Sequence, residues 1–337
     1  MNLKYLGEIL KDEPAFRLKQ IKKAVYQDLI ENWSEATTLS LALREKLSEK
    51  CPLKINGEIF PSKDQETAKA LITLDNGLKI EAVLMQHKEE RNTVCVSSQI
   101  GCPLGCIFCA TGKLEFKRNL KAEEIVEQVL FFARHLKKKD KKITNVVYMG
   151  MGEPFLNYDN VIESIRILND KDGFNLGVRR ISISTIGISE GIEKLADEGL
   201  EINLAISLHA PNDEIRSRLI PYNINYPIKK IFKALEKYIK KTRRRVMLEY
   251  IMIKGENDSD EQAYQLSKLI KNMKNPLCFV NLIAYNPTGI FKPSDQQRIK
   301  EFKNILEQEH IDVTERHRFG REVKAACGQL AYSKSRT

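Results

Sequence analysis

An alternation of strand-like and helix-like segments from about residue 91 onward limits the fold of this chain more than any other feature. Amphipathic segments such as 120–136 and 227–241 separate short runs that are rich in β-branched and aromatic residues. Five such runs are TNVVYMG (144–150), RRISISTIG (179–187), INLAISLH (202–209), RVMLEYIMI (245–253) and FVNLIAYNP (279–287). Repeated βα units form a parallel sheet, so the pattern predicts an α/β fold, a partial (β/α)6 barrel of the TIM type.

The region that precedes this alternation begins with a predicted helical part. Asp12 and Pro14 resemble a helix start, and an apolar stripe from Leu18 to Leu29 follows them at helical spacing. A second helix is predicted over 37–48, where leucines recur at every fourth position. We therefore expect a small helical bundle ahead of the α/β core.

Residues 67–86 predict a β-hairpin. Two β-rich runs flank Asp75-Asn76-Gly77, and Asn and Gly tolerate the positive φ angles that tight turns require. From these patterns we expect three parts, which are an N-terminal helical accessory domain (1–55), a β-hairpin extension (56–90) and a core domain (91–337).

Cysteine spacing gives the strongest indication of chemistry. The chain has seven cysteines, and four of them fall within fifteen residues. In an intracellular protein such crowding indicates metal or redox chemistry rather than a disulfide framework. Three of the four form the pattern Cys102-Pro-Leu-Gly-Cys106-Ile-Phe-Cys109, directly after the strand-like run VCVSSQIG. Barrel enzymes place their reactive groups at such strand ends.

Three thiolates on one tight loop can each bind one iron of a [4Fe-4S] cluster. The fourth iron would stay open, and the amino and carboxylate groups of S-adenosylmethionine (SAM) could chelate it. The alternatives are a structural zinc site and unreactive buried cysteines. Structural zinc normally takes four nitrogen or sulfur ligands, and His87 and His135 are isolated from the cysteine pattern.

Small and polar residues follow several of the predicted strands. Taken alone, a serine or asparagine at such a place is usually a helix cap or a turn residue, and a histidine is usually structural. A glycine, in contrast, lets a ligand lie against the backbone, and a carboxylate suits an ammonium group. The residues in question are Gly152, Glu153, Ser184, Ser207, Leu208, His209 and Asn286.

Seven phrases together closely resemble the RlmN/Cfr family of radical SAM RNA adenine methyltransferases. They are VCVSSQIGCPLGCIFCATG, FKRNL, MGMGEPFLN, RRISISTIG, AISLHAPNDEIRS, NLIAYNP and AACGQLA. The resemblance covers roughly residues 65–337 and implies a radical SAM barrel with a [4Fe-4S] cluster on Cys102, Cys106 and Cys109. It also implies SAM contacts at the seven strand-end residues named above.

The resemblance further implies catalytic roles for Cys95 and Cys327, although each taken alone is a small buried hydrophobe. Adenine C2 is electron-poor and does not attack the methyl group of SAM, whereas a thiolate does. Cys327 is therefore expected to accept a methyl group from one SAM, and a 5′-deoxyadenosyl radical from a second SAM is expected to activate it for addition to adenine. Cys95 would then attack the Cys327 sulfur, which releases the RNA and leaves a disulfide. Glu81 matches the family's proton acceptor, although its spacing to Cys95 is one residue longer than in the best-known member.

The family methylates adenine at C2 or at C8. Pro154 and the phrase AISLHAPND favour C2, whereas CATG and RRISISTIG are shared with the C8 branch or lean towards it. We expect 2-methyladenosine at two sites, which are the peptidyl-transferase centre of 23S rRNA and the position next to the anticodon in tRNA. Both sites are non-helical, so the base can be splayed out into a pocket. The alternatives are a Cfr-like C8 methyltransferase, another radical SAM enzyme such as a glycyl-radical activase, and a metal-stabilised RNA-binding protein without enzymatic activity.

Charge and hydropathy bear on partners and location. The 55 Lys and Arg residues exceed the 45 Asp and Glu residues and give a net charge of +10, which favours a polyanionic partner. No uninterrupted apolar run reaches the ~18 residues of a membrane-spanning helix, and the N-terminus does not resemble a secretory signal. We expect a cytoplasmic monomer that binds RNA and no membrane, and that takes its electron from a donor such as flavodoxin or ferredoxin.

Overall fold

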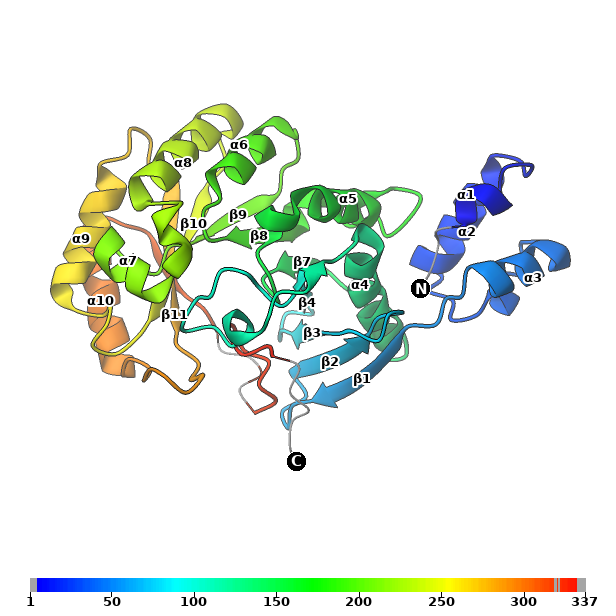
Figure 1. Ribbon diagram of the computed structural model, residues 1–337, viewed down its shortest axis with the longest axis horizontal. Helices are drawn as coiled ribbons and strands as arrows, with labels where there is room; N and C mark the ends of the chain where they lie inside the picture. The colour runs from blue at the N-terminus through cyan, green and yellow to red at the C-terminus, as the bar shows by residue number, and fades with distance from the viewer. Residues whose placement is uncertain (1–4, 318–319, 321, 332–337) are drawn as a thin grey trace.

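The computed structural model describes residues 5–317, 320 and 322–331, and every statement below refers to these residues. A ten-stranded sheet runs through the whole molecule in the order β1-β2-β3-β4-β7-β8-β9-β10-β11-β12. Helices α6, α8, α9 and α10 lie outside the strands, and the N-terminal helices lie at the opposite end of the molecule (Figure 1). Among the described residues, no helix combines the length and apolar character needed to span a membrane.

Seven neighbouring strands, from β4 to β12, pair in parallel and form the barrel-like part of the sheet. The strand order has two ends, so the barrel is open, as the partial α/β barrel predicted from the sequence requires. The strands are β4 (Asn92–Cys95), β7 (Asn145–Tyr148), β8 (Ile181–Thr185), β9 (Asn203–Ser207), β10 (Val246–Met252), β11 (Cys278–Ala284) and β12 (Val313–Glu315). The helices between them are α4 (Ala122–Lys137), α5 (Tyr158–Asn169), α6 (Ser189–Asp197), α7 (Asp213–Leu219), α8 (Ile228–Thr242), α9 (Asp260–Lys271) and α10 (Gln296–Gln308).

The five strand-like runs in the core are all strands, but the run VCVSSQIG is not one continuous strand. Strand β4 ends at Cys95, and Gln99–Ile100 (β5) pairs instead with Arg118–Asn119 (β6) in a separate two-stranded sheet. The physical reason lies at Ser97, whose amide donates to Gln128 Oε1 at 2.8 Å and whose carbonyl accepts from Gln128 Nε2 at 2.9 Å. A helix side chain therefore replaces the next strand-to-strand pair, and the chain turns away from the sheet.

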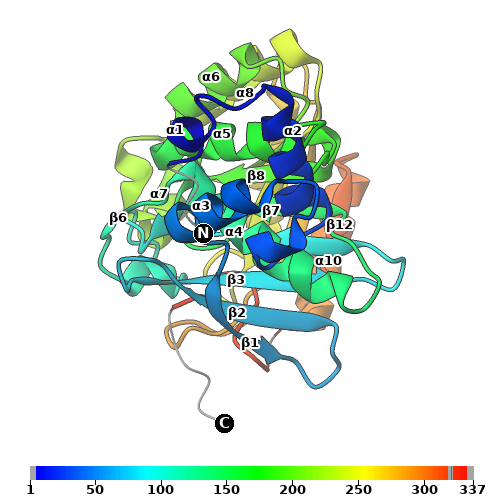
Figure 2. The same cartoon turned by 90° about the vertical axis from the view of Figure 1, so that its right-hand side faces the viewer.

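The predicted hairpin is confirmed and forms part of a larger antiparallel unit. Strands β1 (Asn56–Pro61), β2 (Thr67–Thr73) and β3 (Lys79–Gln86) pair in order, with Gly77 at a φ of 78° in the β2–β3 turn. Strand β3 then pairs antiparallel with β4, so the hairpin is continuous with the main sheet. Figure 2 shows β1, β2 and β3 side by side at this edge, with the N-terminal helices in front.

The N-terminal region is helical, as predicted, but its elements are shorter than the sequence pattern indicated. After α1 (Leu6–Ile9), helix α2 (Phe16–Lys22) continues into one π-helical turn, and Leu29 lies beyond it with a φ of 55°. The second long helix, α3 (Leu41–Lys50), begins four residues later than predicted because Ser40 caps it, accepting from the Leu43 amide at 3.4 Å.

The helical bundle docks on α4 through a buried arginine. Arg134 donates to the carbonyl oxygens of Leu53, at 2.9 Å, and of Ile30. Within the bundle, Trp33 is buried, and its indole nitrogen donates to the Cys51 carbonyl oxygen at 2.6 Å. These side-chain bonds to backbone carbonyls fix the bundle against the outer face of the core.

Candidate active site at the cysteine-rich loop

The three cysteines of the CxxxCxxC pattern lie together on one loop. The Cys109 amide donates to the Cys106 carbonyl oxygen at 3.1 Å, which folds the loop back on itself. Gly101, at a φ of 76°, lets the chain after the loop pass close to its start, because a Cβ there would meet the Glu115 carbonyl oxygen at 2.2 Å. The Ile107 amide donates to the Leu219 carbonyl oxygen at 3.1 Å and ties the loop to the end of α7.

Burial raises the pKa of all three thiols, to about 12 for Cys102. Neighbouring loop cysteines add to this effect at Cys102 and Cys106, and Cys327 adds to it at Cys109. Backbone amides act in the opposite direction at Cys102 and Cys109. Three crowded, buried sulfurs are unfavourable as free thiolates, and bound cations remove that penalty because a coordinating thiol is deprotonated outright. This donor set therefore fits an iron–sulfur cluster, in which each iron takes one thiolate. The fit is one of donor chemistry: as placed in this structure, neither these three sulfurs nor any other group of three or more His, Cys, Asp or Glu side chains within the described ranges forms a metal-binding arrangement.

The glycine–glutamate segment after β7 packs directly against the chain that leads into the cysteine loop. At Gly152, with a φ of 100°, a Cβ would meet Gln99 Cβ at 2.5 Å. The Glu153 amide donates to Gln99 Oε1 at 2.8 Å, and the Glu153 carboxylate accepts from the amides of Phe155, at 3.0 Å, and Ile186, at 2.9 Å. Burial raises the pKa of Glu153 to about 7, against the lowering effect of these hydrogen bonds.

Predicted contacts on β8, β9 and the loop after β9 also come together. Ser184 Oγ and Ser207 Oγ are 3.1 Å apart. His209 has a φ of 59°, and its Nδ1 accepts from the Ile251 amide at 3.2 Å. Its ring lies edge-on to that of Phe108 in the cysteine loop, with the centroids 5.0 Å apart. Burial lowers the pKa of His209 to about 3, and the nearby Arg216 adds to this effect, so the ring is neutral. An uncharged aromatic pair thus joins the loop after β9 to the cysteine loop.

Asn286, just after β11, has a hydrogen-bond partner for its side-chain nitrogen but none among the described residues for its side-chain oxygen. Its Nδ2 donates to the Cys327 carbonyl oxygen at 3.3 Å. Its Oδ1 is buried, and none of the described protein groups donates to it. An unsatisfied buried carbonyl is costly, so this atom fits a ligand that brings its own N–H or O–H donor.

The C-terminal segment carries Cys327 and lies against the cysteine loop. Gly328 accepts from the Ala110 amide at 2.7 Å, and Leu330 accepts from Thr111 Oγ1 at 2.7 Å. Figure 1 shows this segment in red beside the loop. Cys95 belongs to the same buried cluster as Val323, Ala325 and Leu330, which flank Cys327 on this segment. Burial raises the pKa of Cys95 to about 12, and Cys327 adds to this effect. The structure therefore brings both cysteines to the same place as the CxxxCxxC loop.

Glu81 is far more buried than an exposed strand carboxylate. Its Oε1 pairs with Lys69 Nζ at 2.9 Å, with side-chain exposures of 0% for Glu81 and 1% for Lys69. Its Oε2 accepts from the Ala331 amide at 2.7 Å. The carboxylate thus anchors the end of the segment that carries Cys327.

Four site residues were not predicted from the sequence. Glu249 and Arg316 form a pair beside Cys327, Arg216 is fully buried under the loop after β8, and Lys69 pairs with Glu81. Glu249 and Lys69 carried a usable signal, because each is a charged residue inside an apolar strand pattern, RVMLEYIMI and AKALITL. Arg216 and Arg316 lie in polar stretches, where nothing distinguishes them from surface arginines.

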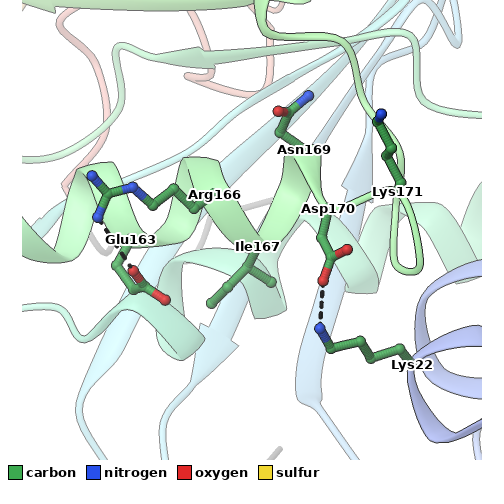
Figure 3. A pocket seen from close by; sticks show the side chains of 7 residues that line it. All are labelled: Lys22, Glu163, Arg166, Ile167, Asn169, Asp170 and Lys171. Atoms are coloured by element: carbon green, nitrogen blue, oxygen red, sulfur yellow. Dashed lines mark hydrogen bonds and ion pairs between the residues drawn. The ribbon is translucent and has the colours of Figure 1, made fainter. Parts of the chain in front are cut away.

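A separate surface pocket of about 430 Å³ contains none of the predicted site residues. It lies between α2 and α5, and Figure 3 shows two ion pairs among the side chains that line it. Lys22 Nζ is 2.5 Å from Asp170 Oδ2, and Arg166 is 3.8 Å from Glu163. The Lys22–Asp170 pair links the helical bundle to the core, and none of the residues that line the pocket suits radical or methyl-transfer chemistry.

Comparison with known proteins agrees with this geometry. Residues 96–267 match the model of the radical SAM superfamily. A "Probable dual-specificity RNA methyltransferase RlmN" of Dictyoglomus turgidum is 48% identical over 320 residues, covering 94% of this chain and 91% of that protein. A "Ribosomal RNA large subunit methyltransferase N" of Nitrosopumilus maritimus is 44% identical over 325 residues, covering 94% of this chain and 92% of that protein. The solved structure of a radical SAM methyltransferase from Sphaerobacter thermophilus is similar, with a TM-score of 0.92 and 42% sequence identity. The match covers 98% of this chain and 97% of that one.

Proposed function

Since this chain belongs to the radical SAM superfamily and, within it, to the RlmN-type RNA methyltransferases, we propose that it converts adenosine to 2-methyladenosine in RNA. It is a radical SAM RNA methyltransferase, and its cofactors are a [4Fe-4S] cluster and SAM. The proposal goes further in assigning the reaction to C2 and the substrates to 23S rRNA and tRNA. The dual specificity named for its relatives and the net charge of +10 support an RNA substrate.

We assign the cluster to Cys102, Cys106 and Cys109, and SAM to a wall made by Gly152, Glu153, Ser184, Ser207, Leu208, His209 and Asn286. The buried thiols of the loop and the unsatisfied Asn286 Oδ1 support these assignments. When bound, the cluster supplies the electron that cleaves SAM and yields a 5′-deoxyadenosyl radical. The chain's own residues would place the substrate groups around it.

One observation supports the proposal most strongly, namely that the segment carrying Cys327 packs against Cys95 on one side and bonds to the residue after Cys109 on the other. In the proposed reaction the Cys327 sulfur accepts a methyl group and later links its carbon to the adenine ring. Cys95 then attacks the Cys327 sulfur and a disulfide forms between the two cysteines. The carbon–sulfur bond to the RNA breaks, and its electron pair stays with the carbon, which takes up a proton and becomes the methyl group. A reductant restores both thiols. A glycyl-radical activase would need the cluster but would leave this cysteine pair unexplained.

We propose Glu81 as the acceptor of the proton that the adenine ring loses. Both oxygens of its carboxylate are engaged in this structure, one by Lys69 and one by the Ala331 amide. Because the Glu81 side chain is 0% exposed and the C-terminal segment lies over one of its oxygens, the proposed role couples proton acceptance to a movement of that segment. Glu81→Gln keeps the acceptor for Ala331 but removes the base, and it should slow release of the RNA more than attachment to it.

The test is the Cys327→Ala variant of the anaerobically reconstituted enzyme. It should make no methylated RNA and yet cleave SAM reductively, because the cluster loop and the SAM wall are intact. Cys278→Ala is the matched control, since Cys278 is buried on β11 away from the site, with its sulfur 3.9 Å from Met273 Sδ. Methylation by Cys327→Ala at the wild-type level would exclude the mechanism, and 8-methyladenosine in nucleoside digests of wild-type product would move the reaction from C2 to C8.

A further inference from the structure

Arg316 contacts the sulfur on which the proposed reaction depends. It follows β12 directly, and its amide donates to the Leu282 carbonyl oxygen at 2.9 Å, which fixes the residue at the end of the sheet. Its Nη1 donates to Cys327 Sγ at 3.4 Å, and its Nη2 lies 3.6 Å from Met149 Sδ. The guanidinium group is thus placed between two sulfur atoms inside the site.

Glu249 holds this guanidinium group in place. Its Oε1 accepts from Arg316 Nη2, and its Oε2 accepts from Ser184 Oγ at 2.9 Å. Ser184 in turn lies 3.1 Å from Ser207 Oγ. A continuous row of polar contacts therefore runs from the proposed SAM wall on β8 and β9, through Glu249 on β10, to Cys327 on the C-terminal segment.

The burial of this pair excludes an incidental surface contact. The side chain of Glu249 is 6% exposed and that of Arg316 is 23% exposed. Burial opposes the charge on Arg316, but Glu249 and Cys327 outweigh it and raise the pKa of the guanidinium group, which stays cationic. A buried carboxylate with no cation beside it would be strongly unfavourable, so Glu249 and Arg316 need each other.

We propose that Arg316, held by Glu249, is a positioning residue that orients the Cys327 sulfur for the step in which it accepts a methyl group. The inference rests on the proposed function. In that step a bond forms between the Cys327 sulfur and the methyl carbon of SAM, and the bond between that carbon and the sulfonium sulfur breaks. The electron pair of the broken bond stays on the departing S-adenosylhomocysteine, and the thiol proton leaves to solvent. An arginine suits this task because its rigid fork can fix a carboxylate and a sulfur at once.

The first test follows methylation of Cys327 itself in the holoenzyme by intact-protein mass spectrometry, as a function of SAM concentration. In Arg316→Gln the maximal rate should fall by at least about tenfold, because misplaced reacting groups cost up to about a hundredfold. The SAM concentration for half-maximal rate and reductive SAM cleavage should change less than this maximal rate, because Arg316 reaches the SAM wall only through Glu249, and cluster absorbance should be retained. Arg316→Lys should recover part of the rate, since it keeps the charge but not the fork. Arg245→Gln is the matched control, because Arg245 is an exposed arginine paired with Asp312 just before β12.

A second readout needs no bound cofactor. Peptide mapping after treatment of the cluster-free protein with iodoacetamide should show slower alkylation of Cys327 in Arg316→Gln, with Cys51 and Cys278 unchanged as internal references. Wild-type rates in both measurements would overturn the inference, and so would an equal loss of SAM cleavage, which marks a collapsed site. If wild-type protein never carries a methyl group on Cys327, the proposed function fails instead, and the two failures are distinct.

Discussion

Lys69→Met should destabilise the protein more than any surface ion-pair deletion, because it leaves the Glu81 carboxylate buried without its cation. The two side chains are 1% and 0% exposed and 2.9 Å apart. Removing one partner of such a pair costs about 3–5 kcal/mol. Lys69→Met with Glu81→Gln removes both charges and keeps an acceptor for the Ala331 amide, so the double variant should be more stable than Lys69→Met.

The assay is urea unfolding of the single and double variants, with the free energy of unfolding compared in a double-mutant cycle. Lys230→Met and Glu190→Gln form the control cycle, because that pair has the same 2.9 Å separation but side chains that are 43% and 60% exposed. Exposed pairs contribute about 0–1 kcal/mol, so the control should change little. Equal costs in the two cycles would refute the argument that burial sets the magnitude.

Three further predictions concern the site. Ser97→Ala should lower the free energy of unfolding in urea by about 1–3 kcal/mol. The Ser97 Oγ donates to the Glu81 carbonyl oxygen at 2.6 Å and accepts from the Met151 amide at 2.9 Å, and an unchanged free energy of unfolding would contradict this role. Gly152→Ala should weaken SAM binding in equilibrium dialysis, since its Cβ would meet Gln99 Cβ at 2.5 Å and displace Glu153; unchanged affinity would show that the segment adapts. Chelating the iron should lower the midpoint of thermal unfolding of the wild-type protein but not that of Cys106→Ala. An equal decrease in the two proteins would exclude the loop as the cluster site.

Much of the fold was predictable because hydrophobic periodicity reports local structure. The strands β7 to β11 and the β2–β3 turn followed from their sequence patterns. The end of β4 at Cys95 could not be predicted in this way. It depends on Gln128, which lies 31 positions after Ser97 in the sequence and hydrogen-bonds to both its amide and its carbonyl oxygen. The three-residue strand β12 is too short to show a period.

The site divides in the same way. Residues in dense motifs, such as Cys102 and Glu153, were found because their spacing is itself the signal. Arg316 and Glu249 lie 67 positions apart, and only the fold shows that they meet. The burial of Glu81 was also beyond sequence reasoning, because it requires both Lys69 and the C-terminal segment to close over the strand.

In the proposed mechanism the methyl carbon reaches RNA by way of Cys327. The most direct measurement loads the Cys327 sulfur with a ¹³C-labelled methyl group, removes free label, and starts one turnover with RNA and unlabelled SAM. We expect mass spectrometry to find the ¹³C in 2-methyladenosine and none left on the protein. Unlabelled product with the label still on Cys327 would contradict it.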